Sequence, residues 1–357
     1  MEYPCEISYG KAITTLPLNP TGLGKLLCAG LNTVPCFASL NQSILNLGTG
    51  ISVKEAEQIL KILCQDVKLS FHKFEQLSNI KSAMDLHLEE QKVEHIVTFC
   101  EALDSMLDGG IPLGEVTEFC GAPGTGKSQF CLQLAVNACI PKCIGGVEGE
   151  TVYIDTEGSF IIDRLVDIAR SAVAHCHQVS VTQGRHGQSQ CDLTMEKILE
   201  SIHCLYCNGY KELMAIILLL QKILSQNQKI KLVVVDNLAS LFRQNLNDMN
   251  LRRLLLATLA KTLLKIAADF NVAVVLTNQM TTKIIPREGN SHLIPAIGDT
   301  WAHVQTNKVV LSVDCHGDRS ALLYKASNKK ETRLPFEINN DGIRDFIHSY
   351  TQVRQPP

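Results

Sequence analysis

The sequence predicts an α/β fold, a mostly parallel sheet with helices on both faces, preceded by a small all-α domain. Its length of 357 residues suits two domains better than one compact core. From about residue 95 onward, short β-branched runs alternate with helical stretches, which is the pattern of a parallel sheet. Before residue 65 the pattern is instead one of short helices joined by turns. We therefore expect domains at 1–65 and 95–357, joined by a linker at 66–94.

Composition narrows the classes of function. The chain has 33 Lys and Arg residues against 36 Asp and Glu residues, a net charge of −3, which excludes a surface that is cationic throughout. With 45% hydrophobic residues it can fill a core, so global disorder is excluded as well. The longest apolar run, Leu213–Leu220, is far shorter than the roughly 20 residues that span a bilayer. We expect a soluble, intracellular protein that contacts no membrane.

The 14 cysteines would suit a disulfide scaffold only in an exported protein. Because the N-terminus lacks a charged and then apolar leader, we expect free, mostly buried thiols. One Cys-x-x-Cys pair occurs, Cys204 with Cys207. A zinc site needs a second pair, and Cys139 with Cys143 is only a loose candidate, so thiols without a metal are favoured.

The N-terminal region carries helix start and stop signals. A helix is expected over 20–29, ended by Gly30. A glycine turn then leads to Ser52 and Glu55, whose spacing is that of a capping box. Helix, glycine turn and helix make up a helix-hairpin-helix, which presents backbone N–H groups to nucleic-acid phosphates. A small bundle that docks or caps is the alternative.

The linker contains a segment of special interest. Ile80 and Ala83 place a hydrophobic and a small residue three positions apart in an otherwise polar stretch. The segment 80–86 is either a tether or an extended strand that adds to the sheet of a neighbouring subunit, with Ile80 and Ala83 in its pockets.

The strongest motif is a complete G-x-x-x-x-G-K-[ST] pattern between a predicted strand and a predicted helix. Its glycines let backbone N–H groups converge on phosphates, and the helix N-terminus adds partial positive charge. Lys127 is expected to reach the β- and γ-phosphates, and Ser128 to bind Mg²⁺. The motif therefore predicts a nucleoside triphosphate site. Its residues are Gly121, Ala122, Pro123, Gly124, Thr125, Gly126, Lys127, Ser128 and Gln129.

Two further strands end in acids. The run 232–236 ends in Asp236, which is thereby expected at the carboxyl edge beside the phosphate loop, as a second group for the metal. The run 151–155 is followed by Glu157, which lies just beyond the strand end. We expect Glu157 to orient or deprotonate the attacking water.

A third strand, 272–277, is followed by Gln279, an amide placed to sense a γ-phosphate. The stretch after it, 280–298, is polar and carries Lys283 and Arg287. A cationic loop directly after a nucleotide sensor suggests ATP-gated contact with a polyanion. An ordinary mobile loop is the alternative.

Together these motifs resemble the RecA-type recombinase family, in its eukaryotic recombination-repair branch, and within that branch a recombinase paralogue. The matching segments are Val97–Ile111, Gly121–Gln129, Tyr153–Phe160, Val233–Asp236, Val272–Gln279 and Asn339–Gly342. The resemblance implies a RecA-like P-loop ATPase core that uses ATP and Mg²⁺, and a helix-hairpin-helix-like N-terminal domain.

The resemblance also implies roles for single residues. Glu157 is the water-activating acid, Asp236 the second metal acid beside Ser128, and Gln279 the γ-phosphate sensor; Glu157, Lys127 and Gln279 form the catalytic set. Arg164 lies on the adenine. The segments about 237–253 and 280–298 are two DNA-facing loops, with cations at Arg243, Arg252, Arg253, Lys283 and Arg287.

The chain departs from the family at three places. The first DNA-facing loop, 243–250, is shorter than in filament-forming recombinases and lacks their glycine-and-arginine insert. At the inter-subunit hook, Ile80 replaces an aromatic residue while Ala83 keeps the alanine. Lys329 and Lys330 fall where the family carries an acidic, proline-bearing cap over the neighbour's ATP, so we hypothesise that one of these lysines supplies a cation in trans. A solvated turn is the alternative.

The leading hypothesis is an ATP-dependent, DNA-binding recombinase paralogue with a slow, DNA-dependent ATPase activity. It would assemble with other paralogues on single-stranded or branched DNA and support recombinase filaments in homologous recombination repair of double-strand breaks. The nucleus, and secondarily the cytoplasm, is the expected location. The alternatives are a self-sufficient strand-exchange recombinase and a nucleotide-independent scaffold.

Overall fold

The computed structural model describes residues 19–28, 51–52, 54–59, 82–182, 193–244, 248–284, 291–295, 301, 307–326 and 331–346. The chain forms two compact units, Met1–Lys92 and Val93–Pro357. The boundary between them lies near the end of the predicted linker.

In the first unit, α1 (Pro20–Cys28) confirms the helix predicted at 20–29. Residues 54–59 form a second helical segment. The predicted capping box at its start is confirmed, since Ser52 N donates to Glu55 Oε2 at 3.1 Å and Glu55 N donates to Ser52 Oγ at 3.4 Å. The glycine turn before Ser52 lies outside the described residues, so the helix-hairpin-helix stays a prediction.

The segment expected to be extended at 80–86 is helical over its described part. Helix α5 spans Ala83–Glu90, and Ile80 lies outside the described residues. Ser82 starts the helix with a capping box of its own: Ser82 N donates to Asp85 Oδ2 at 3.1 Å, and Asp85 N donates to Ser82 Oγ at 3.0 Å. In the single chain Ala83 is therefore helical, because this cap satisfies N–H groups at the start of a helix, and strand addition to a neighbouring subunit stays a prediction.

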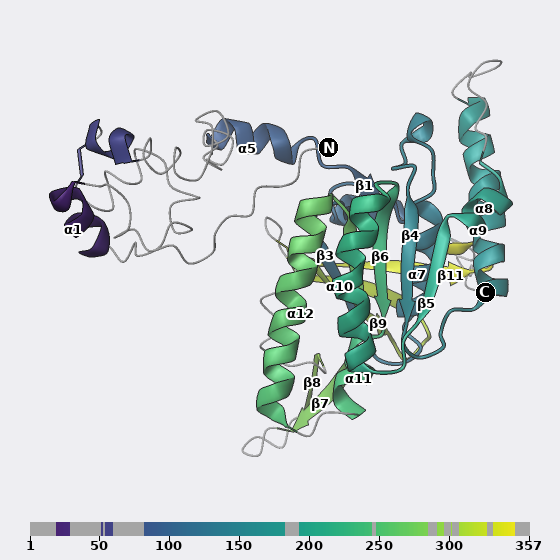
Figure 1. Cartoon of the computed structure of the whole chain (residues 1–357). Helices are drawn as coiled ribbons and strands as arrows, with labels where there is room; N and C mark the ends of the chain where they lie inside the picture. Colours follow the sequence, from purple (N-terminus) through teal and green to yellow (C-terminus); the bar gives the residue numbers. More distant parts are fainter. Residues whose placement is uncertain are drawn as a thin grey trace, which may run out of the picture. The chain divides into compact units, whose positions relative to one another are not determined.

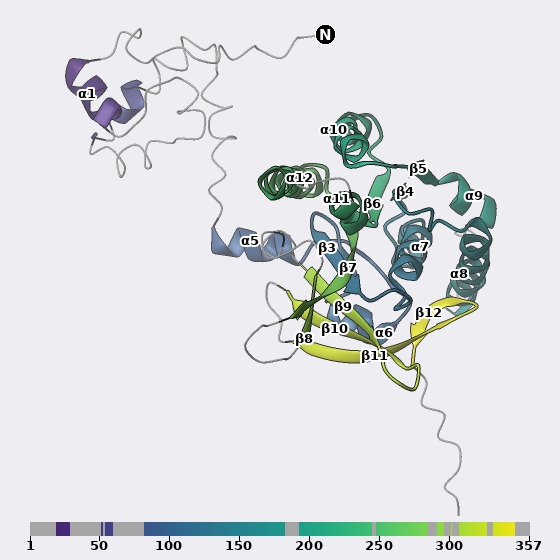
Figure 2. The ribbon, with the colours of Figure 1, turned by 90° about the horizontal axis from the view of Figure 1, so that it is seen from below.

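The second unit (Figure 1) is built on one long sheet, with strand order β12-β11-β10-β9-β3-β7-β6-β4-β5 (Figure 2). The parallel strands are β3 (Val116–Gly121), β4 (Glu150–Asp155), β5 (Ile202–Tyr206), β6 (Ile230–Asp236), β7 (Ala273–Ile284) and β9 (Asn307–Val313). An antiparallel extension adds β10 (Arg319–Lys325), β11 (Thr332–Asn339) and β12 (Gly342–Asp345). A separate pair joins β1 (His95–Ile96) to β2 (Ile111–Pro112).

Helices cover both faces of the sheet, which confirms the predicted fold class. In Figure 2, α7 and α8 lie on one side of the sheet and α10, α11 and α12 on the other. Each face has its own core, with Phe119, Phe130 and Phe336 on the first side and Leu259, Leu263 and Trp301 on the second. The helices are α6 (Glu101–Met106), α7 (Lys127–Asn137), the 3₁₀ turn η3 (Lys142–Ile144), α8 (Ile162–Thr182), α9 (Met195–Glu200), α10 (Tyr210–Gln226), α11 (Leu238–Gln244) and α12 (Met249–Phe270).

The stretch after Gln279, predicted to be a loop over 280–298, is partly regular. Strand β7 continues to Ile284 and pairs antiparallel with β8 (Ser291–Pro295), so the described parts form a two-stranded ribbon. The loop prediction is wrong for these residues, because β-branched residues such as Thr281 and Thr282 favour an extended backbone.

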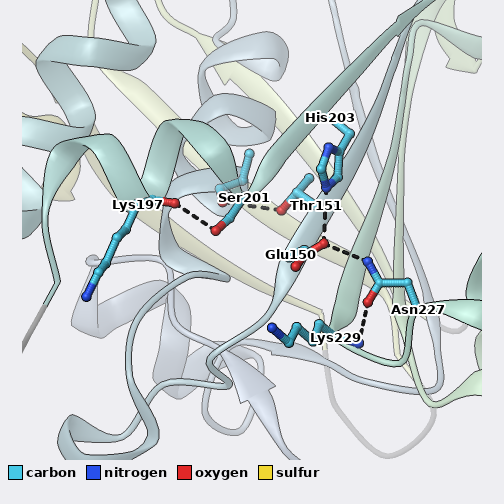
Figure 3. A network of polar contacts seen from close by, with 8 residues as sticks. Glu150, Thr151, Lys197, Ser201, His203, Asn227 and Lys229 are labelled. Carbon is cyan, nitrogen blue, oxygen red and sulfur yellow. Dashed lines mark hydrogen bonds and ion pairs between the residues drawn. The ribbon is translucent and has the colours of Figure 1, made fainter.

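At the amino ends of the strands, a polar network ties β4, β5 and β6 together (Figure 3). Glu150 Oε2 lies 3.1 Å from His203 Nε2 and accepts a hydrogen bond from Asn227 Nδ2 at 2.8 Å. Asn227 Oδ1 accepts the Lys229 N–H at 3.1 Å. Burial acts to raise the pKa of Glu150, but the bonds from His203 and Asn227 outweigh it and lower that pKa. The network secures the edge strand β5 to the sheet.

The described residues bear on three expectations, those for cysteines, for metal sites and for membrane-spanning helices. The cysteines whose side chains are described are free thiols, with Cys204 half-buried on β5 and Cys207 buried. Within the described ranges, no cluster of His, Cys, Asp or Glu side chains is placed to hold a metal ion. In the same ranges no helix is both long and apolar enough to cross a membrane.

Candidate nucleotide site

Parallel pairing brings the predicted site residues to one edge of the sheet. Strand β3 pairs with β7 so that Gly121 lies opposite Gln279. Strand β4 pairs with β6 so that Asp155 lies opposite Asp236. Because β7 and β6 are neighbours as well, the phosphate loop, the two acidic strand ends and Gln279 share the carboxyl edge.

The phosphate loop has the backbone shape that its glycines allow. Gly124 (φ 79°) and Gly126 (φ 106°) adopt left-handed conformations. A Cβ at Gly126 would lie 2.5 Å from Ile338 Cδ1, whereas one at Gly124 would meet nothing within 4 Å. One side of the loop therefore packs on β11 and the other borders open space. Gly121, Ala122, Pro123, Gly124, Thr125 and Gly126 lie at the end of β3 and in the loop, and Lys127, Ser128 and Gln129 in the first turn of α7.

Lys127 lies folded over this loop. Its Nζ donates hydrogen bonds to the carbonyl oxygens of Gly121 and Ala122, both at 2.9 Å. Burial lowers the pKa of the ammonium group, while the negative charges of Asp236 and Glu157 act to raise it. The ammonium group of Lys127 thus lies close enough to Asp236 and Glu157 to interact electrostatically with both carboxylates.

Asp236, at the end of β6, is buried and accepts three hydroxyl hydrogen bonds. Tyr153 Oη and Ser159 Oγ donate to Oδ2, each at 2.8 Å, and Thr277 Oγ1 donates to Oδ1. The sequence placed Asp236 correctly at the strand end but gave its three partners no role. The available signal was only that Tyr153 and Thr277 lie in runs predicted to be strands of the same parallel sheet as 232–236, since the order of those strands was not predicted.

Glu157 and Gln279, for which the sequence predicted separate roles, are in contact. Gln279 Nε2 donates to Glu157 Oε1 at 3.1 Å, and Asn237 Nδ2 donates to the same oxygen at 3.3 Å. The carboxylate is thus held between two amides, one from the end of β7 and one just after β6. Any movement of Gln279 toward a phosphate would change the contacts of Glu157.

Asp155 organises the turn that carries Glu157, a role that sequence reasoning missed. Its Oδ1 accepts the backbone N–H groups of Glu157, Gly158 and Ser159 at 2.9–3.1 Å, and its Oδ2 accepts that of Phe160 at 3.0 Å. A carboxylate that accepts four amides fixes the backbone of the whole turn.

Arg164, on α8, bonds protein groups through all of its guanidinium nitrogens. Nε donates to Gln129 Oε1 at 2.7 Å, and Nη1 and Nη2 donate to the carbonyl oxygens of Asn340 and Asn339, each at 2.6 Å. It therefore joins α7 to the turn between β11 and β12. An adenine contact, which stays a prediction, would have to use the face of the guanidinium plane.

The predicted DNA-facing and partner-facing residues are only partly described. Arg252 is half-buried and Arg253 exposed in the first turns of α12. Arg243 lies in α11 and Lys283 in β7, but their side chains are not described. Arg287, Lys329, Lys330 and Ile80 lie outside the described residues, and Ala83 is exposed on α5.

A phosphate loop after one parallel strand, a buried acid at the end of a second strand and a Glu–Gln pair at the same edge define a RecA-like P-loop ATPase core. The Rad51 family model matches residues 89–182 and 185–346, most of the chain. The chain therefore belongs to the Rad51 family.

Relatives narrow the comparison within the family. The chain is 39% identical to DNA repair protein RAD51 homolog 3 of Cricetulus griseus over 347 residues, which cover 94% of this chain and 92% of that one. It is 40% identical to the Dictyostelium discoideum protein of the same name over 276 residues, 77% of this chain and 72% of that one. With DNA repair and recombination protein RadA of Aeropyrum pernix it shares 31% identity over 340 residues, 94% of this chain and 97% of that one.

These matches confirm the predicted family and branch. The chain is a recombinase paralogue of recombination repair. Proteins of the Rad51 family are in general ATPases that bind ATP with magnesium.

Proposed function

We propose that this chain is a slow, DNA-dependent ATPase that assembles with other recombinase paralogues on single-stranded or branched DNA. In this role it supports recombinase filaments in homologous recombination repair of double-strand breaks, in the nucleus and secondarily in the cytoplasm. The observation that carries the proposal is the 3.1 Å contact between Glu157 and Gln279 at the mouth of the phosphate loop. It links the water-activating acid to the predicted γ-phosphate sensor, as ATP-gated binding requires.

The residues present fit ATP with Mg²⁺. The open side of the loop at Gly124 leaves room for phosphates, and Lys127 has hydrogen bonds to two carbonyls that it can exchange for phosphate oxygens. Ser128 and Asp236 offer the oxygen ligands that Mg²⁺ prefers. When bound, the metal would neutralise charge on the phosphates. Glu157, whose carboxylate is held in place by Gln279 and Asn237, would accept a proton from the attacking water.

Replacing Glu157 with Gln should slow ATP hydrolysis by about 10²–10⁴-fold and leave ATP binding near the wild-type level. The amide cannot accept the proton from water, but it keeps an oxygen for the bonds from Gln279 and Asn237. Phosphate release and nucleotide affinity should be measured on the same preparation. Glu196→Gln, an exposed change on α9, is the matched control. Wild-type hydrolysis by Glu157→Gln would remove Glu157 from the mechanism.

Assembly with a partner is proposed at the β5 edge of the sheet. Of the two outer strands, β12 is covered, because Asp345 accepts N–H bonds from α6 and Arg344 donates to Ser171 of α8. Strand β5 instead exposes Leu205 and Tyr206, the latter at 63%. Among the described residues β5 pairs only with β4, and an edge strand with apolar side chains is a template for strand addition from another chain. The added strand is expected to come from a different protein, because the hook of this chain has Ile80 in place of the aromatic residue of the family. The β5 edge therefore suits a hetero-oligomer.

The double change Leu205→Lys with Tyr206→Lys should reduce co-purification of other recombinase paralogues from cells at least tenfold, because it places two charges on the edge strand. ATP affinity should not change, since neither residue contacts the phosphate loop. Leu254→Lys, an equally exposed apolar position on α12, is the control. Undiminished recovery of paralogues with the double variant would place the interface elsewhere.

A further inference from the structure

The three hydroxyl groups around Asp236 come from three separate parts of the fold. Tyr153 belongs to β4, Ser159 to the turn after β4, and Thr277 to β7. Asp236 itself is 2% exposed, and both Tyr153 and Thr277 are fully buried. None of the three hydroxyl groups belongs to the nucleotide-binding residues that the sequence predicts.

The hydroxyl groups are unevenly divided between the two carboxylate oxygens. An ionised carboxylate has about two acceptor positions on each oxygen. Among the described residues, Tyr153 and Ser159 occupy both positions of Oδ2, at 2.8 Å each, whereas Thr277 occupies one position of Oδ1. One acceptor position, on Oδ1, is therefore left for a metal ion or for a water that the metal holds.

We infer that Tyr153, Ser159 and Thr277 are positioning residues that fix Asp236 to act on Mg²⁺ through Oδ1 alone. The inference rests on the proposed function, since it requires that Mg²⁺ binds with ATP. It adds to that function a hydroxyl cradle, defined as Tyr153, Ser159 and Thr277, which sets the orientation of the metal acid before the metal arrives. Preorganisation of this kind saves the cost of ordering a carboxylate when it binds.

The surroundings keep each hydroxyl group a donor. An ionised carboxylate oxygen can only accept, so the hydroxyl groups of Tyr153, Ser159 and Thr277 are the donors in these contacts. The Tyr153 ring is held edge-on to Phe160, with ring centroids 4.9 Å apart. Thr277 lies beside Asp236 because β6 and β7 pair in parallel register, with Val235 opposite Leu276.

Ser159 also connects the metal acid to the water-activating acid. Its Oγ donates to Asp236, and its backbone N–H donates to Asp155 at 3.1 Å. The same Asp155 oxygen accepts the N–H of Glu157 at 3.1 Å. A shift of Asp236 would therefore reach the turn that positions Glu157. Ser159 should therefore affect both the Mg²⁺ affinity and the rate of hydrolysis, although it acts only through Asp236 and through the turn that carries Glu157.

The test titrates Mg²⁺ into the full-length protein with a fluorescent ATP analogue present, and repeats the nucleotide titration in EDTA. Thr277→Val and Tyr153→Phe each remove one hydroxyl group and keep the side-chain shape. Each should weaken the apparent Mg²⁺ affinity about 10–100-fold, the usual effect of losing a group that orients a ligand. Thr277→Ser should restore it, and nucleotide affinity in EDTA should stay at the wild-type value for all three variants.

Controls separate this idea from a loss of structure and from failure of the proposed function. Thr151→Val removes a buried hydroxyl from the far end of β4, which bonds Ala135 O at 3.3 Å, and should leave the Mg²⁺ titration unchanged. Wild-type Mg²⁺ dependence in Thr277→Val and Tyr153→Phe would overturn the inference, and so would equal impairment of Thr277→Val and Thr277→Ser. In both cases Mg²⁺-ATP binding by the wild-type protein would leave the proposed function standing, whereas its absence would refute the proposed function itself.

Discussion

Replacing Lys127 with Ala is expected to weaken ATP binding by about 10²–10⁴-fold. The ammonium group lies over the phosphate loop, within the field of Asp236 and Glu157, where it can exchange two carbonyl partners for phosphate oxygens. A hydrogen bond between charged groups contributes about 1.5–3 kcal/mol, and about 1.4 kcal/mol changes a dissociation constant tenfold. Two such bonds account for the expected loss, which calorimetric or fluorescence titration of ATP would measure.

The same variant tests whether nucleotide binding governs assembly. If ATP gates the complex, Lys127→Ala should lose affinity for other paralogues and for single-stranded DNA together with its affinity for ATP. Lys261→Ala, an exposed lysine on α12, is the matched control for loss of one positive charge. Partner and DNA affinities that are identical with and without nucleotide would favour the alternative of a nucleotide-independent scaffold.

The parts of the site that sequence alone predicted are those fixed locally or by simple sheet geometry. The phosphate loop is a continuous motif, so Lys127 and Ser128 follow directly from it. Asp236, Glu157 and Gln279 each follow a buried run, and parallel strands bring their carboxyl ends to one edge. That these residues share one edge was predicted, but the contact between Glu157 and Gln279 was not, because it depends on the order of β7, β6 and β4.

What the sequence did not predict depends on contacts between elements. The hydroxyl cradle around Asp236 requires that β4 and β7 flank β6 on opposite sides, which no single segment encodes. The role of Asp155 depends on how the turn 156–160 folds back onto its side chain. Helix α5 does have a local signal that the sequence analysis did not use, since Ser82 and Asp85 stand at capping-box spacing.

The α7 helix that begins at the phosphate loop depends on one aromatic cluster for its position. Phe130 is 1% exposed and stacks on Phe119 of β3, with ring centroids 4.8 Å apart and planes at 17°. It also meets Phe336 of β11 edge to face, at 5.2 Å and 64°. Its backbone N–H donates to Gly126 O at 3.0 Å, so the residue joins three elements directly behind the loop.

Phe130→Ala should therefore lower the free energy of unfolding by about 3–5 kcal/mol, a large part of the roughly 5–15 kcal/mol that holds a domain folded. The change removes a buried ring and with it two aromatic pairs worth about 0.5–1.5 kcal/mol each beyond their buried area. Phe130→Leu should lower the free energy of unfolding much less, because leucine refills most of the volume of the ring. Leu218→Ala, at a position on α10 that is 63% exposed, should lower it by less than about 0.5 kcal/mol. Urea unfolding of the second unit measures all three. Because leucine in place of Phe130 still supports the start of α7, ATP should protect Phe130→Leu against urea as it protects the wild type. A loss of unfolding free energy below about 1 kcal/mol in Phe130→Ala would show that the aromatic cluster does not hold the phosphate loop in place.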